Sequence, residues 1–149
     1  TFGHSLSLKY MWKYYAVLSA IFAALTAIFA KIGIKNVDSN LATAIRTCVI
    51  LLLTWSIVLA GNGASGIKDL TKTNWTFLIL SGVATGLSWL FYFKALQIGE
   101  ASKVAPIDKL SVVFTIFLSF LILGETVSWK VILGGCMIAG GSLVILMDK

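Results

Sequence analysis

The chain has 149 residues, of which 58% are hydrophobic and only 12% are charged. Its mean hydropathy is +0.95. Soluble domains carry about a quarter charged residues, so this composition excludes an ordinary soluble domain and indicates a chain that lies mostly in lipid. The formal net charge of +6 would suggest nucleic acid in a soluble protein. Most of the lysines flank apolar runs, however, where they are expected to snorkel to lipid headgroups. We therefore expect the lipid bilayer, and no nucleic acid, as a partner.

Residues 1–13 are interpreted as an N-terminal tail and interfacial anchor, because Trp12 and Lys13 are residue types of the headgroup level. Residues 14–149 contain five apolar runs of roughly 20 residues, the length that crosses a bilayer as a helix. The predicted spans are about 15–34, 41–60, 75–93, 104–123 and 128–147. Lipid cannot satisfy an open backbone, so the fold is predicted to be an all-α membrane protein with its termini on opposite sides. No cleavable signal peptide is expected, because the first run is long and lacks a small-residue cleavage site.

The positive charges are balanced between the two sides of the predicted membrane domain. Five lie on the side of the N-terminus: Lys9, Lys13, Lys68, Lys72 and Lys130. Five lie on the other side, if Lys94 and Lys109 are set aside as lying within the spans: Lys31, Lys35, Arg46, Lys103 and Lys149. The positive-inside rule, by which the cytoplasmic side carries more Lys and Arg, therefore predicts no single orientation. Either a few lysines dominate insertion, or copies insert in both orientations and pair antiparallel, and the count leaves both open.

The fourth predicted span holds Asp108 and Lys109 shortly after Pro106, which is the only proline. Ser102 is expected to cap this helix, which would place Pro106 in the first turn, where proline is tolerated. Charges at that depth are costly unless they face a cavity or a partner. Neighbours in a helix point about 100° apart, so the two side chains are not expected to pair with each other.

Polar residues recur at helical spacing in three of the predicted spans, which suggests three helix faces around one solvated cavity. The face in the fourth span is formed by Asp108, Ser111, Thr115 and Ser119. Those in the second and third spans are formed by Thr43, Thr47 and Thr54, and by Ser81, Thr85, Ser88 and Tyr92 with Trp89 and Phe93 beside them. The alternative is that the hydroxyls bond backbone carbonyls of their own helices and that Asp108 only interacts with the dipole at the N-terminus of its helix.

Glycines mark predicted helix packing, within the chain or across a dimer interface, since small residues let helix backbones approach closely. They are Gly82 and Gly86 in the third span and Gly134, Gly135, Gly140 and Gly141 in the fifth. Glu125 is expected to cap the turn and the start of the fifth span, and Arg46 and Lys94 to snorkel from span ends. Cys48 and Cys136 have no metal-ligand spacing. No metal, no cofactor and no catalytic residues are predicted, so an enzyme is not expected.

Short segments in the second half of the chain occur in a recognisable order. They are YFKAL at 92–96, GEASKVAP at 99–106, LGE at 123–125 and the glycine-rich stretch 134–141. This order resembles the second half of the EamA-type domain of the drug/metabolite transporter (DMT) superfamily. The resemblance covers nearly the whole chain after about Lys9, with less specific motifs in the first half.

The resemblance implies solute transport by alternating access, often driven by a proton gradient or by exchange. Typical members have ten spans in two inverted five-span domains, with a substrate site between them. A chain with one such half would need an inverted copy as its partner, which the balanced positive charges would permit. The segment PIDKLS at 106–111 departs from the uncharged helix start of larger members and is similar to the small single-domain bacterial and archaeal branch. No substrate-binding residue is carried over.

We therefore expect a small-molecule transporter of a bacterial or archaeal inner membrane that works as an antiparallel homodimer. Asp108 is the expected proton or cation site, Lys109 a countercharge or anion contact, and Trp89 and Tyr92 an aromatic wall. Thr85, Ser88, Ser111 and Thr115 are expected along the same pathway. Two alternatives remain open: a non-transporting accessory subunit of a membrane complex, and a protein that translocates lipids or lipid-linked sugars.

Overall fold

The computed structural model describes residues 2–61 and 63–148, with side chains from residue 11 onward. Every regular element in these ranges is helical. In chain order they are α1 (Phe2–Gly33), α2 (Ser39–Ala60), the short 3₁₀ helix η1 (Gly63–Asp69), α3 (Lys72–Ile98), α4 (Ala101–Asp108), α5 (Ser111–Leu118), the π-helical turn η2 (Ser119–Leu123) and α6 (Trp129–Leu146). The segment predicted as a tail is the first part of α1.

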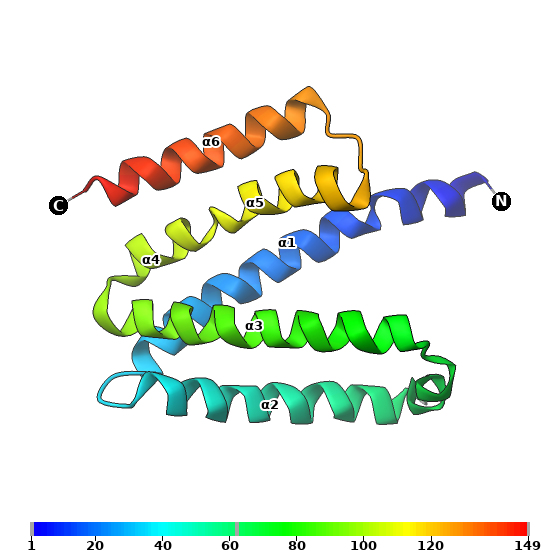
Figure 1. The fold of residues 1–149 in the computed structure, drawn as a ribbon, viewed down its shortest axis with the longest axis horizontal. Helices are drawn as coiled ribbons and strands as arrows, with labels where there is room; N and C mark the ends of the chain where they lie inside the picture. The colour runs from blue at the N-terminus through cyan, green and yellow to red at the C-terminus, as the bar shows by residue number, and fades with distance from the viewer. Residues whose placement is uncertain (1, 62, 149) are drawn as a thin grey trace.

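Five helical stretches are long and apolar enough to cross a membrane, which confirms the five predicted spans. They are Met11–Gly33, Ser39–Ala60, Lys72–Ile98, Ala101–Leu123 and Trp129–Leu146. The third is longer than predicted at both ends. Successive spans run in opposite directions, so α1 begins and α6 ends at opposite ends of the molecule (Figure 1).

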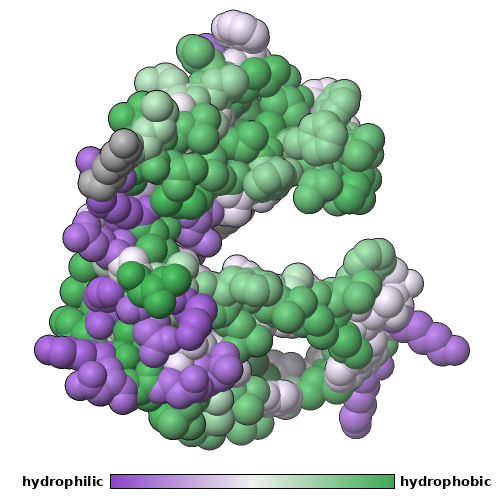
Figure 2. Space-filling model, turned by 60° about the vertical axis from the view of Figure 1, so that its left-hand side comes forward, coloured by the Kyte–Doolittle hydropathy of each residue, from purple (hydrophilic) through white to green (hydrophobic). Residues whose placement is uncertain are grey.

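The helices form two groups that α4 connects. α2 packs along α3, α5 packs along α6, and α4 contacts α1, α3 and α6. A deep cleft separates α5 and α6 from α2 and α3, and apolar residues cover both of its sides (Figure 2). Among the described side chains, most large hydrophobic ones are exposed, and the buried hydrophobic residues are Ala27, Ile34, Phe93 and Leu96. These exposed side chains need lipid or another protein surface around them.

Side chains tie the helices together at the end of the molecule where α2 and α4 begin. The Lys31 ammonium donates to the carbonyl oxygens of Leu96 at 2.6 Å and Gly99 at 2.7 Å, which joins α1 to the last turn of α3. The Gln97 amide donates to the Val37 carbonyl at 2.9 Å. An ion pair of 2.9 Å joins Lys103 to Asp148. This end of the structure is therefore fixed by bonds between segments far apart in the sequence.

The fourth span is broken rather than continuous, and the prediction that Ser102 caps it is wrong. α4 begins at Ala101 after Glu100, so Pro106 lies beyond the first turn. A proline there removes one helical hydrogen bond and crowds the preceding turn. The next amides bond three residues back instead of four: Lys109 to Pro106 and Leu110 to Ile107, both at 3.0 Å. The helix stops at Asp108 and restarts at Ser111.

The start of the fifth span also differs from the prediction. Ser128, not Glu125, caps α6, because the Ser128 hydroxyl accepts from the Val131 amide at 3.4 Å. Before it, Gly124 adopts a φ of 66°, a left-handed conformation that favours glycine. The Glu125 amide closes the π-helical turn by donating to the Ser119 carbonyl at 3.3 Å.

Only one of the glycines predicted to mark packing has a close neighbour on another helix of this chain. A Cβ added to Gly135 would lie 2.9 Å from Cδ1 of Ile116, so Gly135 lets α6 approach α5. Apart from the nearby backbone of the same helix, no atom would lie within 4 Å of a Cβ added at the remaining positions, which are Gly82, Gly86, Gly134, Gly140 and Gly141. The described chain therefore leaves these glycine faces open.

Candidate functional site

A small polar pocket of about 200 Å³ lies among α1, α2, α3 and α4. It is lined by Ala23, Thr26, Arg46, Ser88, Trp89, Tyr92, Asp108 and Lys109. Arg46 and Asp108 each lie about 10 Å inside the start of their helix, at 1.5 Å per residue. The charged residues of this pocket are therefore within the spans, away from the headgroup level.

The polar pocket adjoins two less polar grooves that follow α1. One, of about 600 Å³, runs along the alanine-rich face from Ala16 to Ala27 and shares Ala23, Tyr92 and Lys109 with the pocket. The other, of about 420 Å³, extends toward Val37 and shares Thr26 and Arg46. The three hollows follow one another along α1, with the charged residues at the middle one.

Arg46 is held against the aromatic side chains of α3. Its guanidinium carbon lies 4.3 Å from the centre of the Trp89 ring and 5.2 Å from that of Phe93. A cation over an aromatic face is attracted by the ring quadrupole. Among the described residues, no carboxylate lies within ion-pair distance of Arg46. The expectation that Arg46 snorkels is wrong, because stacking on Trp89 turns it toward α3 and the pocket.

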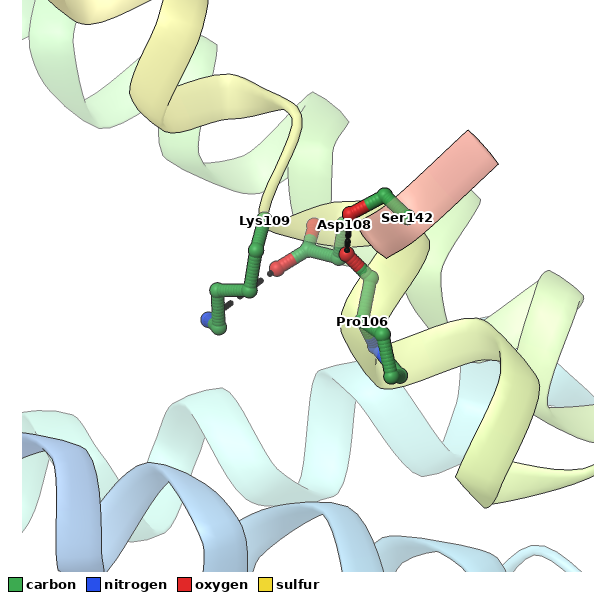
Figure 3. Close-up of polar contacts among 4 residues, drawn as sticks. All are labelled: Pro106, Asp108, Lys109 and Ser142. Carbon is green, nitrogen blue, oxygen red and sulfur yellow. Dashed lines mark hydrogen bonds and ion pairs between the residues drawn. The ribbon is translucent and has the colours of Figure 1, made fainter. Parts of the chain in front are cut away.

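Asp108 and Lys109 approach each other where the fourth span is broken. The Lys109 Nζ lies 3.5 Å from Oδ2 of Asp108 (Figure 3). The prediction that these side chains do not pair is therefore wrong, because the chain leaves the α-helical path after Asp108. The contact is a loose one, since strong charge-assisted bonds of this kind are about 2.7–2.9 Å long. Both side chains keep solvent-accessible surface, at 53% for Lys109 and 37% for Asp108.

A serine of the last helix holds the broken segment in place. The buried Ser142 of α6 donates its hydroxyl to the Pro106 carbonyl at 2.9 Å (Figure 3). That carbonyl also accepts from the Lys109 amide at 3.0 Å. The sequence analysis missed Ser142; its only signal was a single hydroxyl in a glycine-rich apolar helix.

The structure brings together five of the eight residues predicted for the pathway: Ser88, Trp89, Tyr92, Asp108 and Lys109. Thr85, Ser111 and Thr115 are not among the residues that line the pocket. The Thr85 and Thr115 hydroxyls donate to the carbonyls of Ser81 and Ser111, at 2.8 and 2.9 Å. The alternative that hydroxyls bond their own helix therefore describes these two threonines.

The pocket combines opposite charges with an excess of one positive charge. Arg46 and Lys109 are cations and Asp108 is an anion, and Trp89 and Tyr92 add aromatic surface. No group of three or more His, Cys, Asp or Glu side chains in the described part of the chain could hold a metal ion. What the pocket offers a ligand is therefore charge, hydrogen bonding and an aromatic face.

Residues 10–147 match the sequence model of the EamA-like transporter family. The chain belongs to this family. The EamA-like chain is also 47% identical over 134 residues to a Sinorhizobium sp. protein named "Uncharacterized transporter in cobO 3'region". That alignment covers 90% of this chain and 95% of the relative. No solved structure matches the chain.

The family match confirms the resemblance found in the short motifs. Together with the five apolar helices, it identifies a multi-pass membrane protein of a transporter family. The relative is itself little longer than one five-span unit, since 134 aligned residues make up 95% of it.

Proposed function

We propose that this EamA-like protein carries a small solute across a bacterial inner membrane by alternating access, and that the polar pocket is its solute site. The observation that carries the proposal is the grouping of Arg46, Asp108 and Lys109 inside the spans, beside Trp89 and Tyr92. Ionisable residues inside a membrane are costly and usually mark substrate or ion pathways. The hollows that follow α1 on either side supply a route to this site.

Two copies in opposite orientation form the working transporter in this proposal. Transporters built from inverted repeats place their site between the halves, and one five-span unit is one such half. The open glycine faces on α3 and α6 provide surfaces on which helices of a second copy could pack closely. With Arg46 placed inside the spans, the flanking lysines number five on one side and four on the other, and this near balance permits insertion in both directions. The Sinorhizobium relative, which is also about one unit long, supports the same arrangement.

Asp108 carries the coupled proton in this proposal. Its carboxylate is partly accessible and only loosely paired with Lys109, so a proton can reach it without breaking a strong bond. Protonation removes the negative charge and releases Lys109. The broken helix gives this segment backbone freedom that an intact span lacks, and discontinuous helices commonly form transporter sites.

Proteoliposomes holding the purified chain and an internal pH-sensitive dye test the proposal. A defined mixture of amino acids, organic acids and polyamines is added outside, and uptake is measured by mass spectrometry together with internal pH. We expect uptake of at least one solute with a solute-dependent pH change. Asp108→Asn should abolish the pH change, and Asp69→Asn, which alters an acid of η1 outside the spans, should retain it.

Each result has a distinct meaning. Uptake with an unchanged pH signal in Asp108→Asn would remove the proton role and leave transport standing. No protein-dependent uptake from the mixture would argue against solute transport and favour an accessory subunit.

A further inference from the structure

We propose that the solute is a small organic monoanion whose carboxylate binds between Arg46 and Lys109 and whose flat apolar part lies against Trp89 and Tyr92. This inference rests on the proposed function in one respect, which is that the polar pocket is the solute site. It adds the chemical class of the solute.

The anion-binding group is Arg46, which is already held in position without a carboxylate partner. Its guanidinium lies against the rings of both Trp89 and Phe93. Phe93 is 2% exposed, so this support is itself fixed by packing. No hydrogen bond or ion pair within the described chain occupies the N–H groups at the edge of the guanidinium. A guanidinium edge fits the two oxygens of a carboxylate, and stacking reduces the freedom lost on binding.

The charge of the pocket selects among ligand classes. In the state with Asp108 ionised, before it takes up the coupled proton, Arg46, Lys109 and Asp108 sum to one positive charge, which a monoanion neutralises. An organic cation would raise the charge of the site to two inside the membrane, where unbalanced charge is costly. A phosphate monoester carries about −1.5 to −2 charges at neutral pH and would leave an excess of negative charge beside Asp108. A carboxylate therefore fits the site better than either.

The size and walls of the pocket limit the rest of the solute. Drug-sized ligands occupy pockets of about 300–1,000 Å³, and this pocket measures about 200 Å³. The part of its wall that α1 contributes is formed by the small residues Ala23 and Thr26. The space suits one flat ring or a short branched chain attached to the carboxylate.

Three probes with the same ring and different head groups test the inference: benzoate, benzylamine and phenyl phosphate. Binding to the purified full chain in lipid nanodiscs is measured by calorimetric titration and by the rise in melting temperature that a ligand of the folded state produces. We expect benzoate to bind, phenyl phosphate to bind more weakly, and benzylamine not to bind.

Variants then assign the binding to the pocket. Arg46→Gln should abolish benzoate binding, and Arg46→Lys, which keeps the charge and loses the planar edge, should weaken it at least about tenfold. Lys109→Gln, which alters an exposed side chain, should also weaken it and remains informative if the Arg46 variants misfold. Lys94→Gln is the matched control, since it removes an exposed cation of α3 that does not line the pocket.

The inference is overturned if benzoate does not bind, if benzylamine binds more tightly, or if Lys109→Gln and a folded Arg46→Gln retain wild-type affinity. Its failure is distinguishable from failure of the proposed function. Uptake of a cationic solute into proteoliposomes would sustain transport and refute the monoanion. Benzoate binding that depends on Arg46, without uptake of any solute, would sustain the site and refute transport.

Discussion

The hydroxyl of Ser142 donates to the carbonyl oxygen of Pro106 across 2.9 Å, which joins the last helix to the break in the fourth span. Ser142 is buried, and the bond links residues that are 36 positions apart. Because Asp108 and Lys109 follow Pro106 by two and three residues, α6 contributes to the position of these charged side chains. The last span therefore supports the site as well as packing on α5.

Ser142→Ala should lower the free energy of unfolding and loosen the break. Side-chain hydrogen bonds between membrane helices contribute about 0.6 kcal/mol on average and up to about 1.7 kcal/mol, and a loss within this range is expected. Reversible unfolding in mixed micelles measures it. Ser56→Ala is the matched control, because Ser56 is exposed and bonds only its own helix, at the Leu52 carbonyl. Equal losses in the two variants would contradict a special role for Ser142.

Much of the fold could be predicted from the sequence, because apolar length alone marks a span and lipid leaves the backbone no alternative to a helix. The pocket could be predicted in part. Polar periodicity on the third span predicts Ser88 and Tyr92 beside Trp89, the charges of the fourth span point to Asp108 and Lys109, and these residues line one pocket.

Arg46 and the helix break could not be predicted with the same rules. The sequence places Arg46 near a span end, where snorkelling is expected. Arg46 also follows Thr43 by three residues and so shares the polar face of the second span. Its inward direction depends on Trp89 and Phe93 of another helix. The break depends on where α4 begins: starting at Ala101 puts Pro106 past the first turn. Placing the cap at Ser102 instead puts Pro106 in the first turn, where no break is expected.

Lys31→Met should destabilise the end of the molecule where Lys31 joins α1 to the last turn of α3. The ammonium donates to the carbonyls of Leu96 and Gly99, which the last turn of α3 cannot satisfy within its own helix. Hydrogen bonds to charged groups contribute about 1.5–3 kcal/mol, so a loss of about 1–2 kcal/mol is expected after screening at this half-buried site. Hydrogen–deuterium exchange should rise at residues 99–104. Lys35→Met, which removes an exposed lysine from the neighbouring turn, should leave that exchange unchanged; a similar rise there would assign the effect to general loss of charge.

Pro106→Ala should restore a continuous fourth span and impair transport. The alanine regains a backbone N–H that can bond the carbonyl four residues back. Because a proline in a helix interior costs about 3 kcal/mol of stability, its removal should stabilise the helix. Asp108 and Lys109 would then return to the 100° separation of neighbours on a regular helix. We expect a more stable protein with slower solute uptake in proteoliposomes. Unchanged uptake together with slower amide exchange at residues 109–110 would show that transport does not need the break.

Gly82, one of two open glycines of α3, allows the pairing of two copies to be tested apart from the folding of one. Gly82→Leu places a large side chain where the chain itself has no atom within 4 Å of the added Cβ. If a second copy packs on this face, the dimer should dissociate while the melting temperature of the monomer changes little. Mass photometry in nanodiscs measures the ratio of dimer to monomer. Gly135→Leu is the contrasting variant: its Cβ would meet Ile116 at 2.9 Å, so it should destabilise each copy.

Orientation of the two copies needs a separate measurement. Fusing either a cytoplasmically active or a periplasmically active reporter to the C-terminus should give signal in both cases if copies insert both ways, because the flanking lysines are nearly balanced between the two sides. Adding three lysines to the loop between α2 and α3 should then shift most copies to one orientation and reduce the dimer fraction. Dimers that persist in wild-type amount after this shift would show that the copies lie parallel, and the inverted pairing would be wrong.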